Sequence, residues 1–167
     1  MSERILLELL YGEGAHANTL DCVEDVPLDV AGRLSECCPH SIWQLVCHMN
    51  FWMVYELKRI RCENPAYPAH ASESWPASPS PLSEEEWQKA IALFRELLAE
   101  LATLAAAPPD VLSEEVRATH PGHTKRSSSV RAVLWQTLVH NSYHIGQVAI
   151  MRRVLGIWPP RGGGDTW

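Results

Sequence analysis

Apolar residues recur at helical spacing in three long stretches of the chain, at residues 42–61, at 83–106 and from the serines at 127–129 to about 155. Positions three and four apart share one face of an α-helix, so each stretch predicts a helix with a buried side. The stretch 42–61 is apolar on most sides, which indicates deep burial. Alternating apolar and polar positions bounded by hairpin turns do not occur, so we expect no strands.

Residues that favour helix ends stand at the borders of these stretches. Ser41 with Gln44, and Ser83 with Glu86, have the spacing of a capping box, in which two side chains bind free backbone N–H groups at a helix start. Gly156 is well placed to end the last helix, because glycine readily adopts the left-handed conformation that closes helices. These signals predict where the three helices begin and end.

The remaining segments predict shorter pieces and long connections. The pattern at 4–11 is helical, two glycines then interrupt it, and short helices are expected at about 18–23 and from Pro27. The Pro-rich loop at 63–81 is unusually long, and such loops often cover a site. Another helical turn is expected at 110–116. The whole pattern predicts an all-α fold, a single domain over residues 1–167 built as a four-helix bundle with long connections and an interrupted first helix.

Composition and charge narrow the functional classes. The chain has 167 residues, of which 46% are apolar and 20% charged, and its net charge is -6 at pH 7. A nucleic-acid surface needs clustered Lys and Arg, so we expect no nucleic acid as a partner. No uncharged apolar run reaches the roughly 18 residues of a membrane span, so we expect no membrane partner and a cytoplasmic location.

The five cysteines give no sign of a disulfide framework. They are odd in number and lack CxxC spacing, which also argues against a zinc ribbon. Cys47 lies within the buried helix at 42–61, and buried thiols are usually inert packing. We therefore expect reduced thiols, with Cys47 in the core rather than acting as a nucleophile.

Two histidines stand one helical turn apart in the last predicted helix. His140 and His144 share a face with apolar residues, so both imidazoles point into a core. A buried polar group without a partner costs on the order of 1–3 kcal/mol. A divalent metal would satisfy both rings, and the alternative is that both hydrogen-bond to Thr, Asn, Tyr or backbone groups.

A third histidine favours the metal. His48 lies near the middle of the helix at 42–61, and facing helices of a bundle are where inward side chains assemble metal sites. Three protein ligands with one vacant position are typical of catalytic zinc sites. That position would hold water or a substrate sulfur or oxygen, whose pKa the metal lowers. Asn141 stands where the HExxH motif of zinc proteases has its glutamate base, so peptide hydrolysis of that type is disfavoured.

Three further residues are candidates for a pocket beside this site. His16 could lie at the mouth of the bundle, although a surface or hydrogen-bonded histidine is the simpler interpretation. Tyr55 and Arg59 continue the face of His48 by two and three turns and could line a pocket for an anionic substrate. A core tyrosine and a salt-bridged arginine are the alternatives.

Three segments carry a likeness to a known family. They are Ser41-Ile-Trp-Gln-Leu-Val-Cys-His48-Met-Asn-Phe-Trp52, His140-Asn-Ser-Tyr-His144-Ile-Gly-Gln147 and Pro159-Pro-Arg-Gly-Gly-Gly-Asp-Thr-Trp167. With the early Gly14-Ala-His16 turn they resemble the DinB and YfiT-like superfamily, named for DNA-damage-inducible bacterial proteins, over nearly the whole chain. The resemblance makes His48, His140 and His144 the metal ligands, commonly of zinc or nickel.

The resemblance also implies an up-down-down-up bundle and, often, a homodimer. It does not imply one reaction, because some relatives are thiol transferases that use bacillithiol or mycothiol, some are isomerases of maleylpyruvate type, and many are described only as metal-dependent hydrolases. We therefore expect a small-molecule substrate. The leading hypothesis is an enzyme whose metal activates a low-molecular-weight thiol or water for transfer to, or hydrolysis of, a small electrophile. The alternatives are a stress-linked metal-binding or sensing protein without turnover and a structural helical module.

The outer side of the last helix is apolar as well. Trp135, Leu138, Val139 and Ala149 lie on the side opposite the histidines. A bundle helix with apolar residues on its outer side needs a second partner. We expect a homodimer that uses this surface.

Overall fold

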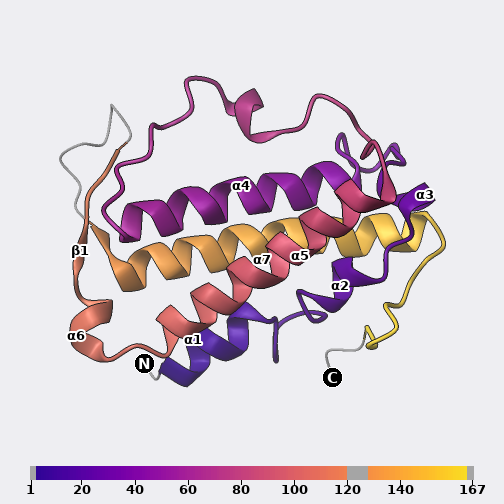
Figure 1. Cartoon of the computed structure of the whole chain (residues 1–167). Coiled ribbons are helices and arrows are strands. Elements are labelled where there is room, and N and C mark those ends of the chain that lie inside the picture. Colours follow the sequence, from indigo (N-terminus) through magenta and orange to yellow (C-terminus); the bar gives the residue numbers. More distant parts are fainter. Residues whose placement is uncertain (1–2, 120–127, 165–167) are drawn as a thin grey trace.

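The computed structural model describes residues 3–119 and 128–164. Four helices form the body, namely α1 (Glu3–Leu10), α4 (Ile42–Ile60), α5 (Glu84–Ala105) and α7 (Val130–Val154). α4 and α5 run in the same direction, because the segment 61–83 returns the chain to the end of the bundle at which α4 begins (Figure 1). α1 and α7 run the opposite way. The bundle is therefore up-down-down-up, as the resemblance implied.

Short elements occupy the connections. They are α2 (Asp21–Glu24), α3 (Leu28–Ala31), the 3-10 helix η1 (Ala71–Ser74) and α6 (Pro109–Leu112). Gly12 and Gly14 take positive φ angles of 84° and 72° where the first helix stops, a conformation that glycine adopts at little cost. The interrupted first helix is confirmed.

The expectation of no strands is wrong in one place. Two-residue strands, β1 (Glu115–Val116) and β2 (Ser128–Ser129), pair in antiparallel fashion with Glu115 opposite Ser129. A ladder of two residues is too short to show the alternation by which a strand is recognised in a sequence. The helical turn expected at 110–116 is accordingly α6 followed by β1.

The predicted starts of α4 and α5 are confirmed, with one difference. At α4 the capping box is complete, because Ser41 Oγ accepts from the N–H of Gln44 at 3.2 Å and Gln44 Oε1 accepts from the N–H of Ser41 at 3.1 Å. At α5, Ser83 Oγ accepts from the N–H of Glu86 at 3.2 Å. The Glu86 carboxylate, however, binds the N–H of Leu82 rather than that of Ser83. Both helices still gain side-chain acceptors for their free N–H groups.

α7 begins and ends at the predicted residues. Ser129 Oγ accepts from the backbone N–H of Ala132 at 3.2 Å. Gly156 follows the helix with a φ of 75°, and the N–H of Ile157 donates to the carbonyl of Arg152 at 2.9 Å. This pairing satisfies a carbonyl group that the helix end would leave free.

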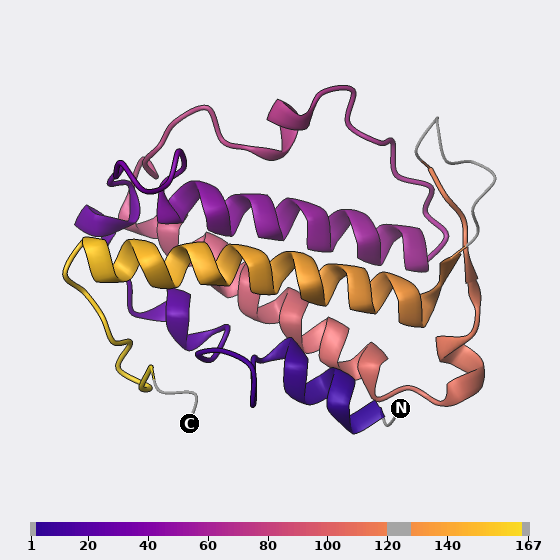
Figure 2. The same ribbon diagram turned by 180° about the vertical axis from the view of Figure 1, so that it is seen from behind.

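The core lies between α4, α5 and α7, and α7 runs beside α4 along most of its length (Figure 2). Its fully enclosed apolar side chains come from all three helices and include Leu45, Met49, Met53, Trp87, Phe94, Leu98, Val133, Val148 and Met151. Burial of each large apolar side chain contributes roughly 1.5–3 kcal/mol. Among the described residues, no helix combines the length and apolar content that crossing a bilayer requires.

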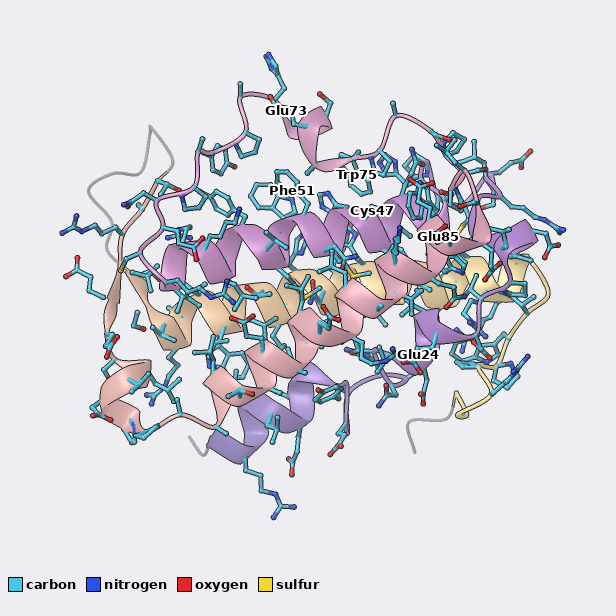
Figure 3. All side chains as sticks on the ribbon, in the orientation of Figure 1. Glu24, Cys47, Phe51, Glu73, Trp75 and Glu85 are labelled. Atoms are coloured by element: carbon cyan, nitrogen blue, oxygen red, sulfur yellow. The ribbon has the colours of Figure 1, made fainter. Side chains whose placement is uncertain are left out.

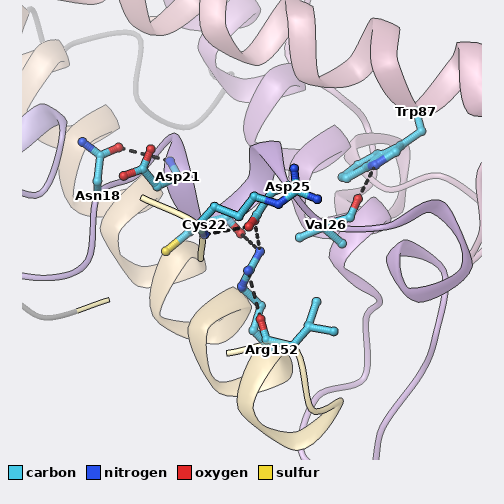
Figure 4. Close-up of polar contacts among 9 residues, drawn as sticks. Asn18, Asp21, Cys22, Asp25, Val26, Trp87 and Arg152 are labelled. Atoms are coloured by element: carbon cyan, nitrogen blue, oxygen red, sulfur yellow. Dashed lines mark hydrogen bonds and ion pairs between the residues drawn. The ribbon is translucent and has the colours of Figure 1, made fainter. Parts of the chain in front are cut away.

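A buried ion pair ties the early short helices to the end of α7 (Figure 4). Arg152 is 1% exposed, and its Nη1 donates to Asp25 Oδ1 at 2.7 Å and to the carbonyl of Cys22 at 3.2 Å. Its Nη2 donates to the carbonyl of Ile157 at 2.9 Å, and Asp25 Oδ2 accepts from the N–H of Arg161 at 2.7 Å. Burial opposes the charge of Asp25, but these hydrogen bonds and the Arg152 charge outweigh it and lower the pKa of Asp25.

We expect Asp25→Asn to lower the free energy of unfolding by about 3–5 kcal/mol, because it leaves the Arg152 guanidinium buried without its counter-ion. The matched control is Asp29→Asn, which breaks an exposed pair with Arg33 and should cost about 0–1 kcal/mol. Urea unfolding followed by circular dichroism measures both. Equal losses in the two variants would contradict this role for Asp25.

Candidate metal centre

The three candidate histidines meet where α4 packs beside α7. Nε2 of His140 lies 3.2 Å from Nε2 of His48 and 3.2 Å from Nε2 of His144. One ligand atom from each of the three residues lies within 4.8 Å of the others. Two nitrogen ligands at 2.0–2.1 Å from a tetrahedral zinc ion are about 3.3 Å apart, so this spacing fits a single ion.

Burial keeps the three imidazoles neutral at pH 7. Burial, with a smaller contribution from the neighbouring ring of His144, lowers the pKa of His48 to about 3 and that of His140 to about 4. The pKa of His144 is also lowered by burial, partly offset by its hydrogen bond to Gln147. Neutral imidazole is the form that binds a metal, and imidazole suits zinc and nickel among the divalent ions.

In His48 and His144, the hydrogen bond at Nδ1 determines that Nε2 faces the other rings without a proton. Gln147 Oε1 can only accept, so Nδ1 of His144 donates to it at 2.7 Å. Ser74 Oγ donates its only proton to the carbonyl of Ala71 at 2.8 Å, so it accepts from Nδ1 of His48 at 3.0 Å. Both neutral rings therefore present an unprotonated Nε2 to the centre. The donor set fits a divalent metal held by His48, His140 and His144.

The loop at 63–81 covers this centre, as its length suggested. The ring of Trp75 stacks on the ring of His48, with centroids 3.7 Å apart and planes at 9°. On its other side it stacks on His40, at 3.8 Å and 12°. Trp75 points from the loop toward α4 (Figure 3). The indole thus lies between two imidazoles and shields one face of the His48 ring.

Other aromatic rings complete the surroundings of the triad. Trp52, one turn after His48, contacts that ring edge-on with centroids 6.3 Å apart. The ring of Tyr143 meets His144 edge-on at 5.1 Å, and Tyr143 is 65% exposed. The centre therefore has uncharged aromatic neighbours on both helices.

Asn141 belongs to the core and not to the metal centre. It is 2% exposed, and its Nδ2 donates to the sulfur of Met53 at 3.2 Å. The position that carries the glutamate base in zinc proteases thus holds an amide directed into the packing between α7 and α4. An amide in that position cannot act as the base of a protease of that type.

The structure does not bring His16 to the triad. Its Nδ1 donates to the carbonyl of Ala17 at 2.8 Å, so its Nε2 accepts from Ser142 Oγ at 3.0 Å. Ser142 lies about 160° around α7 from His144, on the opposite side of the helix. His16 is a hydrogen-bonded histidine that joins the first turn of the chain to α7.

Tyr55 and Arg59 have structural partners of their own. The Tyr55 hydroxyl hydrogen-bonds with Thr119 Oγ1. Arg59 Nη1 pairs with Glu56 at 2.6 Å, and its Nε and Nη2 donate to the carbonyl of Arg117 at 3.2 and 3.1 Å. Both side chains hold the end of α4 to the segment after β1, which is the alternative considered from the sequence. Tyr55 also lines a cleft between α4 and α5, away from the histidines.

The residues that orient the ligands were not among the sequence candidates. Gln147 had a usable signal, because it lies three residues after His144 and so shares its face. Ser74, Trp75 and His40 had none, since no helical spacing relates them to His48. Their positions depend on the path of the loop through space, which the sequence pattern does not determine.

Comparison with known proteins identifies the family. The family model described as DinB superfamily matches residues 12–148, well over half of the chain. This chain belongs to the DinB superfamily. No curated protein matches the chain. The resemblance drawn from the sequence is thereby confirmed.

One solved structure similar to this DinB-superfamily chain is YfiT from Bacillus subtilis, described as "a probable metal-dependent hydrolase with an unusual four-helix bundle topology". The TM-score is 0.64, and the alignment covers 93% of this chain and 90% of that one. The two sequences are 16% identical. At that identity the likeness establishes a shared fold.

We expect Ser74→Ala to weaken zinc binding by about 10–100-fold, because His48 loses the acceptor that holds its Nδ1 proton. Ser72→Ala is the matched control, since Ser72 lies in the same short helix η1 and is exposed. Competition with a chromophoric chelator measures the zinc affinity of each. An unchanged affinity in Ser74→Ala would contradict the proposed orientation of His48.

Proposed function

We propose that this protein is an enzyme in which His48, His140 and His144 bind a divalent transition metal, zinc or nickel. Its reaction would be transfer of a low-molecular-weight thiol to a small electrophile, or hydrolysis of that electrophile. The observation that carries the proposal is the convergence of three neutral imidazoles, two of them with Nε2 directed inward by Ser74 and Gln147. Three protein ligands match catalytic rather than structural zinc sites.

A bound metal would lower the pKa of a thiol or water beside it and so supply a nucleophile at neutral pH. The chain's own residues prepare the site for this chemistry. Ser74 and Gln147 orient the ligand rings, and Trp75 keeps water from one face of His48. Electrostatic interactions are stronger where water is excluded.

The neighbours of the triad favour thiol transfer over hydrolysis. In the described part of the chain the side chains that hydrogen-bond to the three rings or stack on them are uncharged, and none of these is a carboxylate that could act as a general base. A thiol already deprotonated at neutral pH needs no separate base, whereas water attack usually uses one. All five cysteines are free, which suits the reducing cytoplasm as the location.

The same absence of a base keeps a second candidate open to test, a stress-linked protein that binds or senses metal without turnover.

The enzyme proposal predicts that metal-loaded protein conjugates a low-molecular-weight thiol, such as bacillithiol, mycothiol or glutathione, to electrophiles such as monobromobimane. His48→Ala should lower this rate on the order of 100-fold, because the site loses its electrostatic activation. His70→Ala, which removes an exposed histidine of the covering loop, is the control. Stoichiometric metal with equal rates in wild type and His48→Ala would favour the non-catalytic alternative.

We also propose that two copies pair through α7. Large apolar side chains are exposed along one line of this helix, at Val139 (60%), Tyr143 (65%), Ile150 (52%) and Val154 (58%). Helical spacing keeps all four within about 60° around the axis. This line replaces most of the surface expected from the sequence, because Leu138 is buried at 7% exposure, and Trp135 and Ala149 are half-buried.

The exposed line of Val139, Tyr143, Ile150 and Val154 is self-complementary when two α7 helices pair in antiparallel fashion. Val139 of one copy would lie opposite Val154 of the partner subunit. Tyr143 would lie opposite Ile150 of the partner subunit, as an isologous twofold interface requires. Gly146 stands at the midpoint, where an added Cβ would meet nothing within 4 Å of its own chain. A glycine there lets two helices approach closely.

We expect Gly146→Cys to form an intermolecular disulfide under mild oxidation, because the two copies of this residue would lie beside the twofold axis. The background carries Cys37→Ser and Cys62→Ser to remove the exposed native thiols. Ala132→Cys, also exposed on α7 but 14 residues from Gly146, should not cross-link. Non-reducing electrophoresis and light scattering give the readout. A monomer at micromolar concentration, or equal cross-linking at both positions, would contradict antiparallel pairing.

A further inference from the structure

A cleft lies on α4 away from the histidines. It has a volume of about 640 Å³ and runs between α4 and α5 beneath residues 65–66 of the covering loop. Its α4 wall includes Cys47, Val54 and Lys58, which lie about 100° around the helix from His48. Cys47 and Phe51 are seen on the loop-facing side of α4 (Figure 3). Small-molecule sites typically have volumes of about 300–1,000 Å³, so this cleft has the size of one.

The walls of the cleft are largely apolar. Phe51 and Val54 of α4 face Leu93 of α5, which remains 39% exposed. Cys47 contributes a neutral thiol, because burial raises its pKa to about 12 and the charge of Glu86 adds to the shift. An apolar chain that bound in the cleft would release water from these apolar walls, which favours binding. The neutral thiol of Cys47 is not a nucleophile.

Two polar atoms of the lining residues lack hydrogen-bond partners. Trp43 Nε1 and Asn50 Oδ1 are buried and unpaired within the described chain, and the two residues are about two helical turns apart on α4. Each such atom costs roughly 1–3 kcal/mol. Both atoms are enclosed by the chain, so a molecule in the cleft would not hydrogen-bond to them, and they do not determine its chemistry.

Charge is distributed unevenly along the cleft. Lys58, at the end of α4, is exposed and forms no salt bridge with any described residue, whereas Lys89 pairs with Glu85 at 2.8 Å. Glu86 lies at the other end, near Trp43, because α4 and α5 run in the same direction. Trp43 and Lys58 are 15 residues apart, about 22 Å along a helix. An anionic head is therefore favoured at Lys58 and an apolar tail toward Trp43.

We propose that this cleft binds a linear carboxylate with an apolar chain, such as a medium-chain fatty acid. Its carboxylate would pair with Lys58, and its chain would lie along Phe51 and Val54. The site is separate from the metal centre, and its occupation requires neither the metal nor the proposed reaction.

The test is calorimetric titration of metal-free protein with dodecanoate below its critical micelle concentration. Wild type should bind one molecule. Leu93→Glu, which places a charge on the apolar wall, and Lys58→Glu, which reverses the head-group charge, should each weaken binding by about tenfold or more. Leu34→Glu and Arg131→Glu make the same chemical changes at exposed positions outside the cleft and should bind as wild type does. Thermal melting of each variant verifies that it is folded.

Further measurements test the charge of the ligand and the location of its site. Dodecanol should bind more weakly than dodecanoate, and dodecyltrimethylammonium more weakly still, because neither carries the negative charge. His48→Ala should bind dodecanoate as wild type does, and a loss there would place the ligand at the histidines and overturn the proposal. No saturable binding by wild type, or equal affinity in wild type and folded Leu93→Glu and Lys58→Glu, would overturn it as well.

Discussion

The parallel course of α4 and α5 is the constraint on which the rest of the structure depends. Two consecutive helices that run the same way need a connection as long as the first helix, and 19 residues of α4 rise about 28 Å. That connection cannot avoid crossing the surface of α4. It therefore brings Ser74 and Trp75 over His48, where one accepts a hydrogen bond from the ring and the other stacks on it. The same segment supplies the roof of the apolar cleft.

The bundle contains two buried polar clusters, one around Arg152 and one formed by the three histidines. Arg152 has its counter-ion Asp25 and two backbone carbonyls as partners inside the chain, although its Nε has none among the described residues, and this cluster stabilises the fold. The histidine triad is complete only on its outer side. Ser74 and Gln147 bind the outer nitrogens of two rings, while the inner nitrogens face one another at 3.2 Å. The unprotonated Nε2 atoms of His48 and His144, with His140 between them, form a donor set that fits a cation.

Helix positions and the pairing of His140 with His144 could be predicted from the sequence because both depend on local periodicity, and His48 was added because facing helices of a bundle bring inward side chains together. Ser41 and Ser129 begin their helices as their spacing indicated, and His140 and His144 share a face because they are four residues apart. Features that depend on non-local paths could not be predicted. The stacking of Trp75, the two-residue strands and the partners of Arg59 all follow from where loops run in space. The outer surface of α7 was only partly predicted, since Leu138 is covered by neighbouring elements.

The histidines and the side chains that orient His48 lie on different segments of the chain, and this affects how such a protein can change during evolution. The three histidines belong to two long helices whose residues also form the core, so substitutions there affect folding. Ser74 and Trp75 belong to a connection that contributes little to the core. Variation in the connection can thus alter how firmly a ligand is held and what reaches it, while the helices and their histidines stay the same. A single scaffold can in this way acquire different reactivities without rebuilding its interior.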